Sequence, residues 1–346
     1  MAEGFFDRML HRMAFSPAIR SFAERAQEAR FGDALDAAKP DHPIFICGIP
    51  RAGSTILLQR LHSAPNVVSS LYRDMPFPTA PLWWNATAPQ RAAARDGERA
   101  HGDGVRTGPD SPEAFDEVLW LEHWPEHFCH NHIALWREAE RKPAFERDWC
   151  RWIAALAVLR KNGDETVRPV LKNNGHIARL RYVAALWPNA AIIVPYREPG
   201  QQAASLLNQH LRTIDRQQKN AFSRLYMDDL GHFEFGSGHR PIRFPTFTPS
   251  AHDPRSADYW LAYWEAAYRH VLDELPANAW LFDFDRACAD PAIADRALAT
   301  RIDDRFARLS GPELAPPSRR ELPASAGAAA LYREMRTHKR NLLPPA

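Results

Sequence analysis

The chain has 346 residues and a formal net charge of +2 at pH 7, with 45% hydrophobic and 25% charged residues. These values are ordinary for a globular protein with a substantial core, and they exclude a strongly basic protein that would bind nucleic acid through its overall charge. The 4 cysteines are dispersed and form no Cys-x-x-Cys pair, so we expect free, reduced thiols and a cytoplasmic location.

Residues 1–39 are predicted to form a helical segment that precedes the main domain. Apolar side chains recur there at near-helical spacing, at Phe5, Met9, Met13 and Phe22. Charged residues interrupt them, so we expect no secretory signal. No apolar run in the sequence reaches the roughly 18 residues that a membrane span requires.

Residues 43–58 predict a buried strand, a glycine-bounded loop and a helix that begins with two hydroxyl residues. The spacing Gly48-x4-Gly53 fits a P-loop, in which backbone N–H groups and a helix N-terminus hold phosphate. A nucleoside triphosphatase needs Lys after the second glycine, whereas this chain has Ser54, and the nearest cation is Arg51. The loop therefore predicts a site for a phosphorylated nucleotide other than ATP with magnesium.

Two irregular insertions are predicted within the main domain, which we place at residues 40–310. The first covers about 76–163; it is rich in Pro, Ala, Gly and charge up to residue 112, and then becomes helical and tryptophan-rich. The second covers about 213–256 and holds glycine, proline and aromatic residues with little periodicity. We expect these insertions to line the site and to set the choice of acceptor.

A second apolar strand is predicted at residues 190–196, followed by Arg197 and a helix that carries Ser205. The guanidinium fork and the hydroxyl could bind one phosphate together. Two phosphate sites at two strand–helix junctions imply a nucleotide with phosphate at two positions. Because strands alternate with helices, we predict an α/β fold with a central parallel sheet between two helical layers and the ligand at the carboxyl ends of its strands.

The last part of the domain is predicted to contain an amphipathic helix at 256–274 and a strand at 280–285. A Pro- and Ala-rich tail follows at 311–346, with a short basic helix near 328–340. The basic residues of that helix are candidates for binding an adenine ring: Arg333, Arg336, Lys339 and Arg340.

The loop GIPRAGST and the segment YREPGQQAAS resemble the 5′-phosphosulfate loop and the 3′-phosphate motif of the sulfotransferases. The run LKNNGHIARLRYVAALWPNAAIIVPYREP is similar to a stretch common in bacterial and Golgi-type members, and the resemblance covers roughly residues 40–285. YRDMPF, DSPEAFDEVLW and DLGHFEFG resemble features of one bacterial subgroup. The resemblance implies a P-loop-type three-layer fold and transfer of a sulfuryl group from 3′-phosphoadenosine 5′-phosphosulfate to a hydroxyl or amine, with no metal.

The resemblance also assigns a role to each of the two predicted phosphate sites, the loop of Arg51 and the junction that carries Arg197 and Ser205, which we call the two phosphate corners. Arg51 would contact the 5′-phosphosulfate and stabilise the leaving group, while Arg197 and Ser205 would bind the 3′-phosphate. Lys172, at the end of a predicted strand, would face the cofactor. Backbone and hydroxyl donors would come from the loop residues Ala52, Gly53, Ser54 and Thr55. The acceptor stays open among small molecules, glycans, lipids and peptides.

The general base has several candidates, because a base must only lie within hydrogen-bond reach of the acceptor. Asp74 lies about twenty residues past the loop, near the position where tyrosylprotein relatives carry a glutamate. Glu113 follows, although a carboxylate there also suits a helix N-terminus. His101 is a further candidate, and Glu117 and His176 complete the set.

Three alternatives compete with this interpretation. A metal site could form from His123, His127, His130, His132 and Cys129, but Pro125 interrupts the helical spacing, so we expect none. A P-loop kinase would need Lys at position 54 and a metal-binding aspartate, for which Asp283 and Asp285 are candidates. A catalytically inactive nucleotide-binding protein would keep both phosphate corners.

Overall fold

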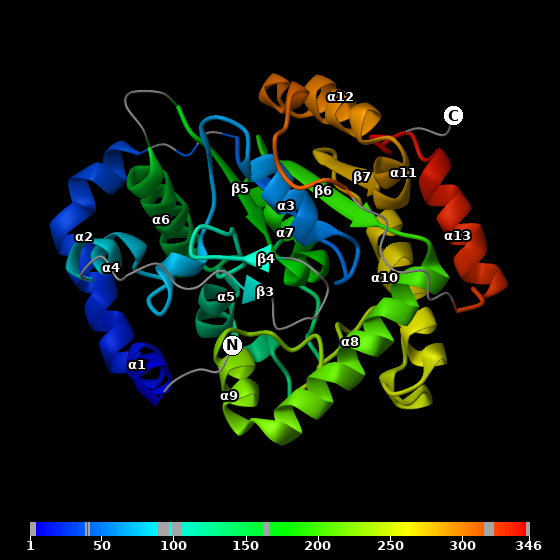
Figure 1. Cartoon of the computed structure of the whole chain (residues 1–346), viewed down its shortest axis with the longest axis horizontal. Helices are drawn as coiled ribbons and strands as arrows, with labels where there is room; N and C mark the ends of the chain where they lie inside the picture. Colours follow the sequence, from blue (N-terminus) through cyan, green and yellow to red (C-terminus); the bar gives the residue numbers. More distant parts are fainter. Residues whose placement is uncertain are drawn as a thin grey trace.

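The computed structural model describes residues 5–38, 40, 42–88, 97–98, 106–161, 166–314 and 322–343. A parallel sheet lies at its centre, flanked by helices (Figure 1). It has five strands in the order β2–β5–β1–β6–β7. The strands are β1 (Ile44–Ile46), β2 (Val67–Val68), β5 (Arg168–Lys172), β6 (Ala191–Tyr196) and β7 (Ala279–Asp283). Because β1 has later strands on both sides, the chain order reverses at β1, where α/β sheets commonly bind ligands.

Helices flank this sheet, and a short antiparallel pair, β3 (Gly97–Glu98) and β4 (Arg106–Thr107), lies apart from it. The α-helices are α1 (Phe5–Ala14), α2 (Pro17–Ala37), α3 (Ser54–His62), α4 (Pro81–Thr87), α5 (Glu117–His123), α6 (Pro143–Arg160), α7 (Leu180–Leu186), α8 (Pro199–Lys219), α9 (Ala221–Asp229), α10 (Ala257–Asp273), α11 (Phe284–Ala289), α12 (Pro291–Arg301) and α13 (Ala326–Thr337). Short 3₁₀ helices are η1 (Tyr72–Asp74), η2 (Pro125–His127), η3 (Asn174–Arg179), η4 (Pro249–Ala251) and η5 (Asp304–Ala307).

Both faces of the sheet are buried, because successive side chains of β1 belong to two different core clusters. Phe45 joins a cluster with side chains of α6, α7, α8, α10 and α13. Ile44 and Ile46 join a second cluster with side chains of α3, α11 and α12. Strands buried on both faces read as continuous apolar runs, as these do. The predicted three-layer α/β fold with a central parallel sheet is confirmed.

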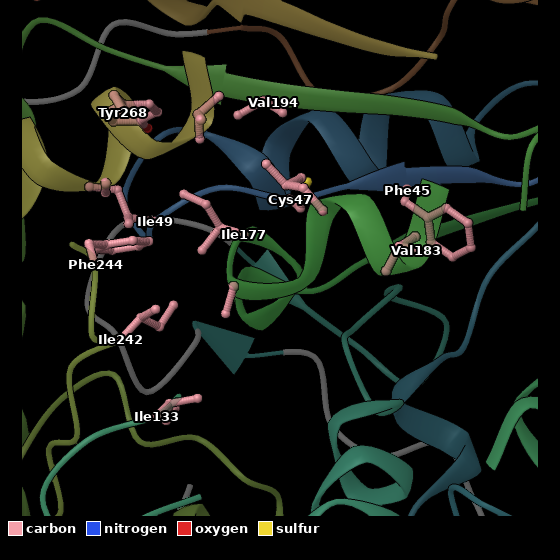
Figure 2. Close-up of a cluster of buried hydrophobic side chains, with 14 of the residues drawn as sticks. Phe45, Cys47, Ile49, Ile133, Ile177, Val183, Val194, Ile242, Phe244 and Tyr268 are labelled. Carbon is pink, nitrogen blue, oxygen red and sulfur yellow. The ribbon is translucent and has the colours of Figure 1, made fainter. Parts of the chain in front are cut away.

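The larger core cluster extends from the sheet toward the loop that follows β1. Figure 2 shows Phe45, Cys47 and Ile49 along this path, with Ile133 and Ile242 approaching from two other loops. Burial of Cys47 raises the pKa of its thiol strongly. This cysteine therefore acts as a small apolar core residue.

One secondary-structure expectation was wrong. The segment predicted to be irregular from residue 213 is helical as far as Asp229, in the last turns of α8 and in α9. The buried face of the second half of α8 is polar and includes Gln209, Thr213 and Gln217. The sequence there therefore lacks the apolar periodicity that predicts a helix. Irregular chain begins at residue 230. Among the described residues, no helix has both the length and the apolar character needed to cross a bilayer.

Candidate active site

The loop between β1 and α3 has a backbone that depends on glycine. Gly53, directly before α3, has φ +82°, and a Cβ placed there would lie 2.5 Å from Cζ of Phe284 and closer still to two other ring carbons. Phe284 is the first residue of α11 and is buried. Only a residue without a side chain allows this close approach of α11 to the loop.

The two phosphate corners predicted from the sequence lie in contact with each other. The Nη1 group of Arg197, which follows β6, donates a hydrogen bond to the main-chain oxygen of Arg51 at 3.2 Å. The Nε group of Arg51 donates to the hydroxyl of Ser205 in α8 at 3.0 Å. Ser205 is therefore beside the loop arginine, and both guanidinium groups belong to one site at the carboxyl ends of β1 and β6.

Arg197 is only 3% exposed, and its side chain also meets two acceptors besides the loop. Its Nη2 group donates to Gln201 Oε1 at 3.1 Å, and its Nε group lies 3.4 Å from Asp285 Oδ1. Burial lowers the pKa of Arg197, and the Asp285 carboxylate partly offsets this effect. Asp285 also accepts a hydrogen bond from the backbone N–H of Glu198 at 2.6 Å, so both of its carboxylate oxygens have partners at residues 197 and 198.

Asp283, the other aspartate considered for a metal, has a structural position. It caps the N-terminus of α11 by accepting from the backbone N–H of Arg286 at 3.0 Å. Its second oxygen lies 3.1 Å from Nε of Arg336 in α13. Of the basic residues proposed for adenine, Arg336 is therefore paired, and Arg340 donates to the main-chain oxygen of Pro276 at 3.1 Å.

Lys172 and Glu113 meet one strand away from the phosphate loop. Lys172 ends β5 in register with Ile46 of β1, and its Nζ lies 3.6 Å from Oε1 of Glu113. Both side chains are buried. Glu113 accepts from the hydroxyl of Tyr72 at 2.8 Å and from the backbone N–H of Ala114 at 2.9 Å. A carboxylate with three fixed neighbours thus lies beside the carboxyl end of the sheet.

Glu117 and His176 belong to a buried polar network at Asn173, the residue that follows Lys172. Arg179 donates through Nε to Nδ1 of His176 at 3.0 Å, so Nδ1 is an acceptor and the imidazole proton is on Nε2, which faces Asp116 at 3.1 Å. Burial lowers the pKa of His176, in agreement with this neutral state. Arg179 also pairs with Glu117. These side chains support the end of β5.

Asn173 connects that network to the sheet, and sequence reasoning missed it. Its side-chain nitrogen donates to Asp116 at 2.8 Å and to Glu117 at 2.7 Å, and its backbone N–H donates to Ile46 at 2.9 Å. The signal was present in the LKNNGH run, because polar residues that directly follow a buried strand lie at the ligand edge of the sheet.

Asp74 has different surroundings. Its carboxylate accepts two contacts from Nη2 of Arg160, at 2.5 and 2.7 Å, and one from the backbone N–H of Leu71 at 2.8 Å. Burial raises the pKa of Asp74, although Arg160 opposes the change. The structure thus places Asp74 in an ion pair between η1 and α6 rather than beside Lys172. His101 lies outside the described residues.

A cavity of about 610 Å³, measured with its open mouth, adjoins the loop and Lys172. Ala114 and Glu117 line it from the DSPEAFDEVLW segment, and residues 231–234 line it from the DLGHFEFG segment. Tyr72 of YRDMPF reaches the same region through Glu113. Two of the three sequence features, far apart in the chain, therefore line one cavity, and the third contacts Glu113, the partner of the lining residue Lys172.

The remaining lining is largely apolar. It includes Ile49, Pro50, Ile133, Phe233, Ile242, Trp260 and Tyr263. The isoleucines belong to the core cluster of Figure 2, so the cavity wall is continuous with the core. Glu234 and Arg240, which also line the cavity, were missed by the sequence analysis because only the fold brings residues 230–256 against the loop.

Two of the histidines considered for a metal have other partners. His123 lies 3.3 Å from Asp148, and His127 lies 3.3 Å from Glu140 and stacks on Trp136 with ring centroids 4.1 Å apart. Within the described ranges, no group of three His, Cys, Asp or Glu side chains is arranged to hold a metal ion.

Comparison with known proteins gives one family. The model of a sulfotransferase family matches residues 43–235, a segment that contains both phosphate corners, Glu113 and Lys172. No curated protein matches the sequence.

Three solved structures are similar to the chain. Sulfotransferase STF1 from Mycobacterium tuberculosis has 15% identity and a TM-score of 0.45, with 95% of this chain and 80% of that chain covered. Sulfotransferase STF9 from Mycobacterium avium has 14% identity and a TM-score of 0.48, with 95% and 75% covered. A sulfotransferase from Alicyclobacillus acidocaldarius has 15% identity and a TM-score of 0.35, with 81% and 87% covered.

Proposed function

Because the chain belongs to the sulfotransferase family, we propose that it transfers a sulfuryl group from 3′-phosphoadenosine 5′-phosphosulfate to a hydroxyl or amine of an organic acceptor. The observation that carries this proposal is the hydrogen bond from Arg197 to the main-chain oxygen of Arg51. It brings the two segments to which we assign phosphate binding into contact, and this supports a ligand with phosphate at both its 3′ and 5′ positions.

The loop and α3 would bind the 5′-phosphosulfate. Ser54 and Thr55 are the first residues of α3, whose N-terminal N–H groups and dipole favour a negative ligand. With Ala52 and Gly53 they would supply backbone and hydroxyl donors, and Arg51 would add its charge. Arg197 and Ser205 would hold the 3′-phosphate from the neighbouring corner.

In this reaction the bond between sulfur and the phosphate oxygen of the donor breaks as the acceptor oxygen or nitrogen bonds to sulfur. Charge moves onto the leaving phosphate, where Arg51 would stabilise it, and Lys172 would stabilise the sulfuryl oxygens. The acceptor proton must go to a base. We assign that role to Glu113, because its carboxylate is fixed by Tyr72 and Ala114 and lies 3.6 Å from Lys172, which lines the cavity.

Ligand binding separates this proposal from its rivals. We expect adenosine 3′,5′-bisphosphate to bind in calorimetry without a metal and ATP to bind weakly, and we expect radioactive sulfate to pass from the donor to an acceptor. Tight, magnesium-dependent ATP binding would instead support a kinase. Bisphosphate binding with no transfer to any acceptor would support an inactive nucleotide-binding protein.

The base assignment has its own test. Glu113→Gln should lower kcat by about a hundredfold or more, the usual contribution of a general base, and leave the affinity for the bisphosphate unchanged. Asp74→Asn is the comparison variant, since Asp74 was the first candidate in the sequence. If Asp74→Asn abolishes turnover and Glu113→Gln does not, the base is Asp74.

A further inference from the structure

Arg240 differs from the other charged residues that line the cavity. Lys172 lies beside Glu113, and Glu117 pairs with Arg179. In the part of the chain that the structure describes, Arg240 has no carboxylate within ion-pair distance; its guanidinium lies over the ring of Phe233, 4.1 Å from the centroid. Among the described residues, the cavity therefore contains one guanidinium that lies over an aromatic ring and has no carboxylate partner.

Glu234, the acidic residue of the same loop, is occupied elsewhere. It accepts from the side-chain nitrogen of Asn174 at 3.1 Å, and its other oxygen lies 3.7 Å from Nδ1 of His232. Glu234 thus faces Asn174 and His232 and leaves the N–H groups of Arg240 without a carboxylate acceptor.

The loop that carries Arg240 is held firmly at both ends. Gly231, at φ +73°, lies so close to Glu117 that an added Cβ would be 2.6 Å from its Cγ. The backbone N–H of Arg240 donates to the oxygen of Phe233 at 2.8 Å, which closes the loop. The next residue, Pro241, accepts from Ile133 at 2.9 Å. The backbone that carries Arg240 is therefore fixed, and its guanidinium lies over the Phe233 ring.

A guanidinium that has no carboxylate partner in the described part of the chain, and that lies on a largely apolar wall, can bind an anionic ligand. Arg presents its donors in a planar fork that matches a carboxylate or a phosphate, and stacking on an aromatic ring leaves the edge of the fork open. Ile133, Ile242 and Trp260 line the same cavity, so water competes less well for that edge than at an open surface.

We propose that the acceptor carries an anionic group, a carboxylate or a phosphate, which Arg240 binds while the hydroxyl or amine to be sulfated points toward Lys172 and Glu113. The inference rests on the proposed function for the identity of the reacting end. The anion site itself depends only on the cavity and on Arg240.

Matched probes test the anion site by binding alone. 4-Hydroxyphenylacetate and 4-hydroxyphenylacetamide share the ring and the phenol and differ in charge, and 4-hydroxyphenyl phosphate replaces the carboxylate with a phosphate. In calorimetry with the full chain, we expect at least one anionic probe to bind tenfold or more tightly than the amide. Which anion binds better distinguishes carboxylate from phosphate as the natural group.

Variants assign the preference to one side chain. Arg240→Gln should abolish the preference for the anion, and Arg240→Lys, which keeps the charge without the fork, should retain part of it. Arg243→Gln is the matched control, because Arg243 is exposed in the same loop and does not line the cavity; it should keep the full preference. Equal affinity for charged and neutral probes, a preference that survives Arg240→Gln, or no binding of any probe at about 10 mM would overturn the proposal.

The sulfuryl-transfer proposal and the anion-site proposal can fail independently, and the experiments distinguish the two failures. If adenosine 3′,5′-bisphosphate does not bind but the anionic probe does so through Arg240, the sulfuryl-transfer proposal fails and the anion site stands. If the bisphosphate binds and acceptors are sulfated without any preference for charge, the anion site fails and the proposed function stands.

Discussion

Gly53→Ala tests the link between the phosphate loop and the core. At φ +82°, an alanine costs about 1–2 kcal/mol in backbone strain. Its Cβ would also overlap the Phe284 ring, which is buried in the core cluster of α3, α11 and α12, and overpacking of this kind costs about 1–3 kcal/mol. We therefore expect a loss of about 2–5 kcal/mol in the free energy of unfolding, measured by urea denaturation, with weaker binding of the bisphosphate because the loop N–H groups move.

Two further variants make this prediction specific. In a Phe284→Ala background the ring is gone, so Gly53→Ala should cost only the backbone share of about 1–2 kcal/mol. Gly32→Ala is the control, because Gly32 lies within α2 and its nearest neighbour, Glu28 Oε1, would be at 3.5 Å; it should stabilise by about 0.4–1 kcal/mol. The reasoning is refuted if Gly53→Ala is neutral, or if its cost is the same with and without the ring.

Arg197→Ala should weaken bisphosphate binding by roughly 1.5–3 kcal/mol, the scale of a hydrogen bond to a charged group, and unchanged affinity in calorimetry would place the 3′-phosphate elsewhere. Arg160→Met leaves the buried Asp74 carboxylate unpaired and should destabilise by about 3–5 kcal/mol, which thermal unfolding would detect; a neutral result would show that the pair is dispensable. Burial lowers the pKa of His239 to about 3, and its ring is held neutral between the Phe233 oxygen and the Tyr259 hydroxyl. Because the unfolded chain binds a proton below pH 6.5 and the folded protein does so only near pH 3, the free energy of unfolding should fall by about 2 kcal/mol between pH 8 and pH 5. His239→Gln should therefore show a smaller change in the free energy of unfolding over this pH range. The same change in both proteins would contradict this prediction.

The elements that position the site were predictable from short stretches of sequence. The strand at 44–46, the glycine loop and the start of α3 are contiguous, and their pattern reflects local rules of burial, turn geometry and helix initiation. The same holds for β6 with Arg197 and α8. Alternation of such units also predicts the parallel sheet. The helical course of 213–229 was missed because its buried stripe is polar.

The partners of the charged side chains could not be predicted in this way. Asp74 and Glu113 were both candidates for the general base in the sequence. In the structure Asp74 pairs with Arg160, 86 residues away, whereas Glu113 pairs with Lys172. Each pairing depends on which loops pack together, and nothing near either carboxylate in the sequence indicates its partner.

The sequence by itself determined the two strand–loop–helix units on a parallel sheet to which we assign phosphate binding, because each unit is built by one contiguous segment of the chain. Only the tertiary structure decided that Arg197 bonds to the loop of Arg51, that Glu113 lies beside Lys172, and that Arg240 lines the cavity with no carboxylate partner among the described residues. These are contacts between side chains and distant segments, and they exist only once the long insertions have folded against the ends of the strands.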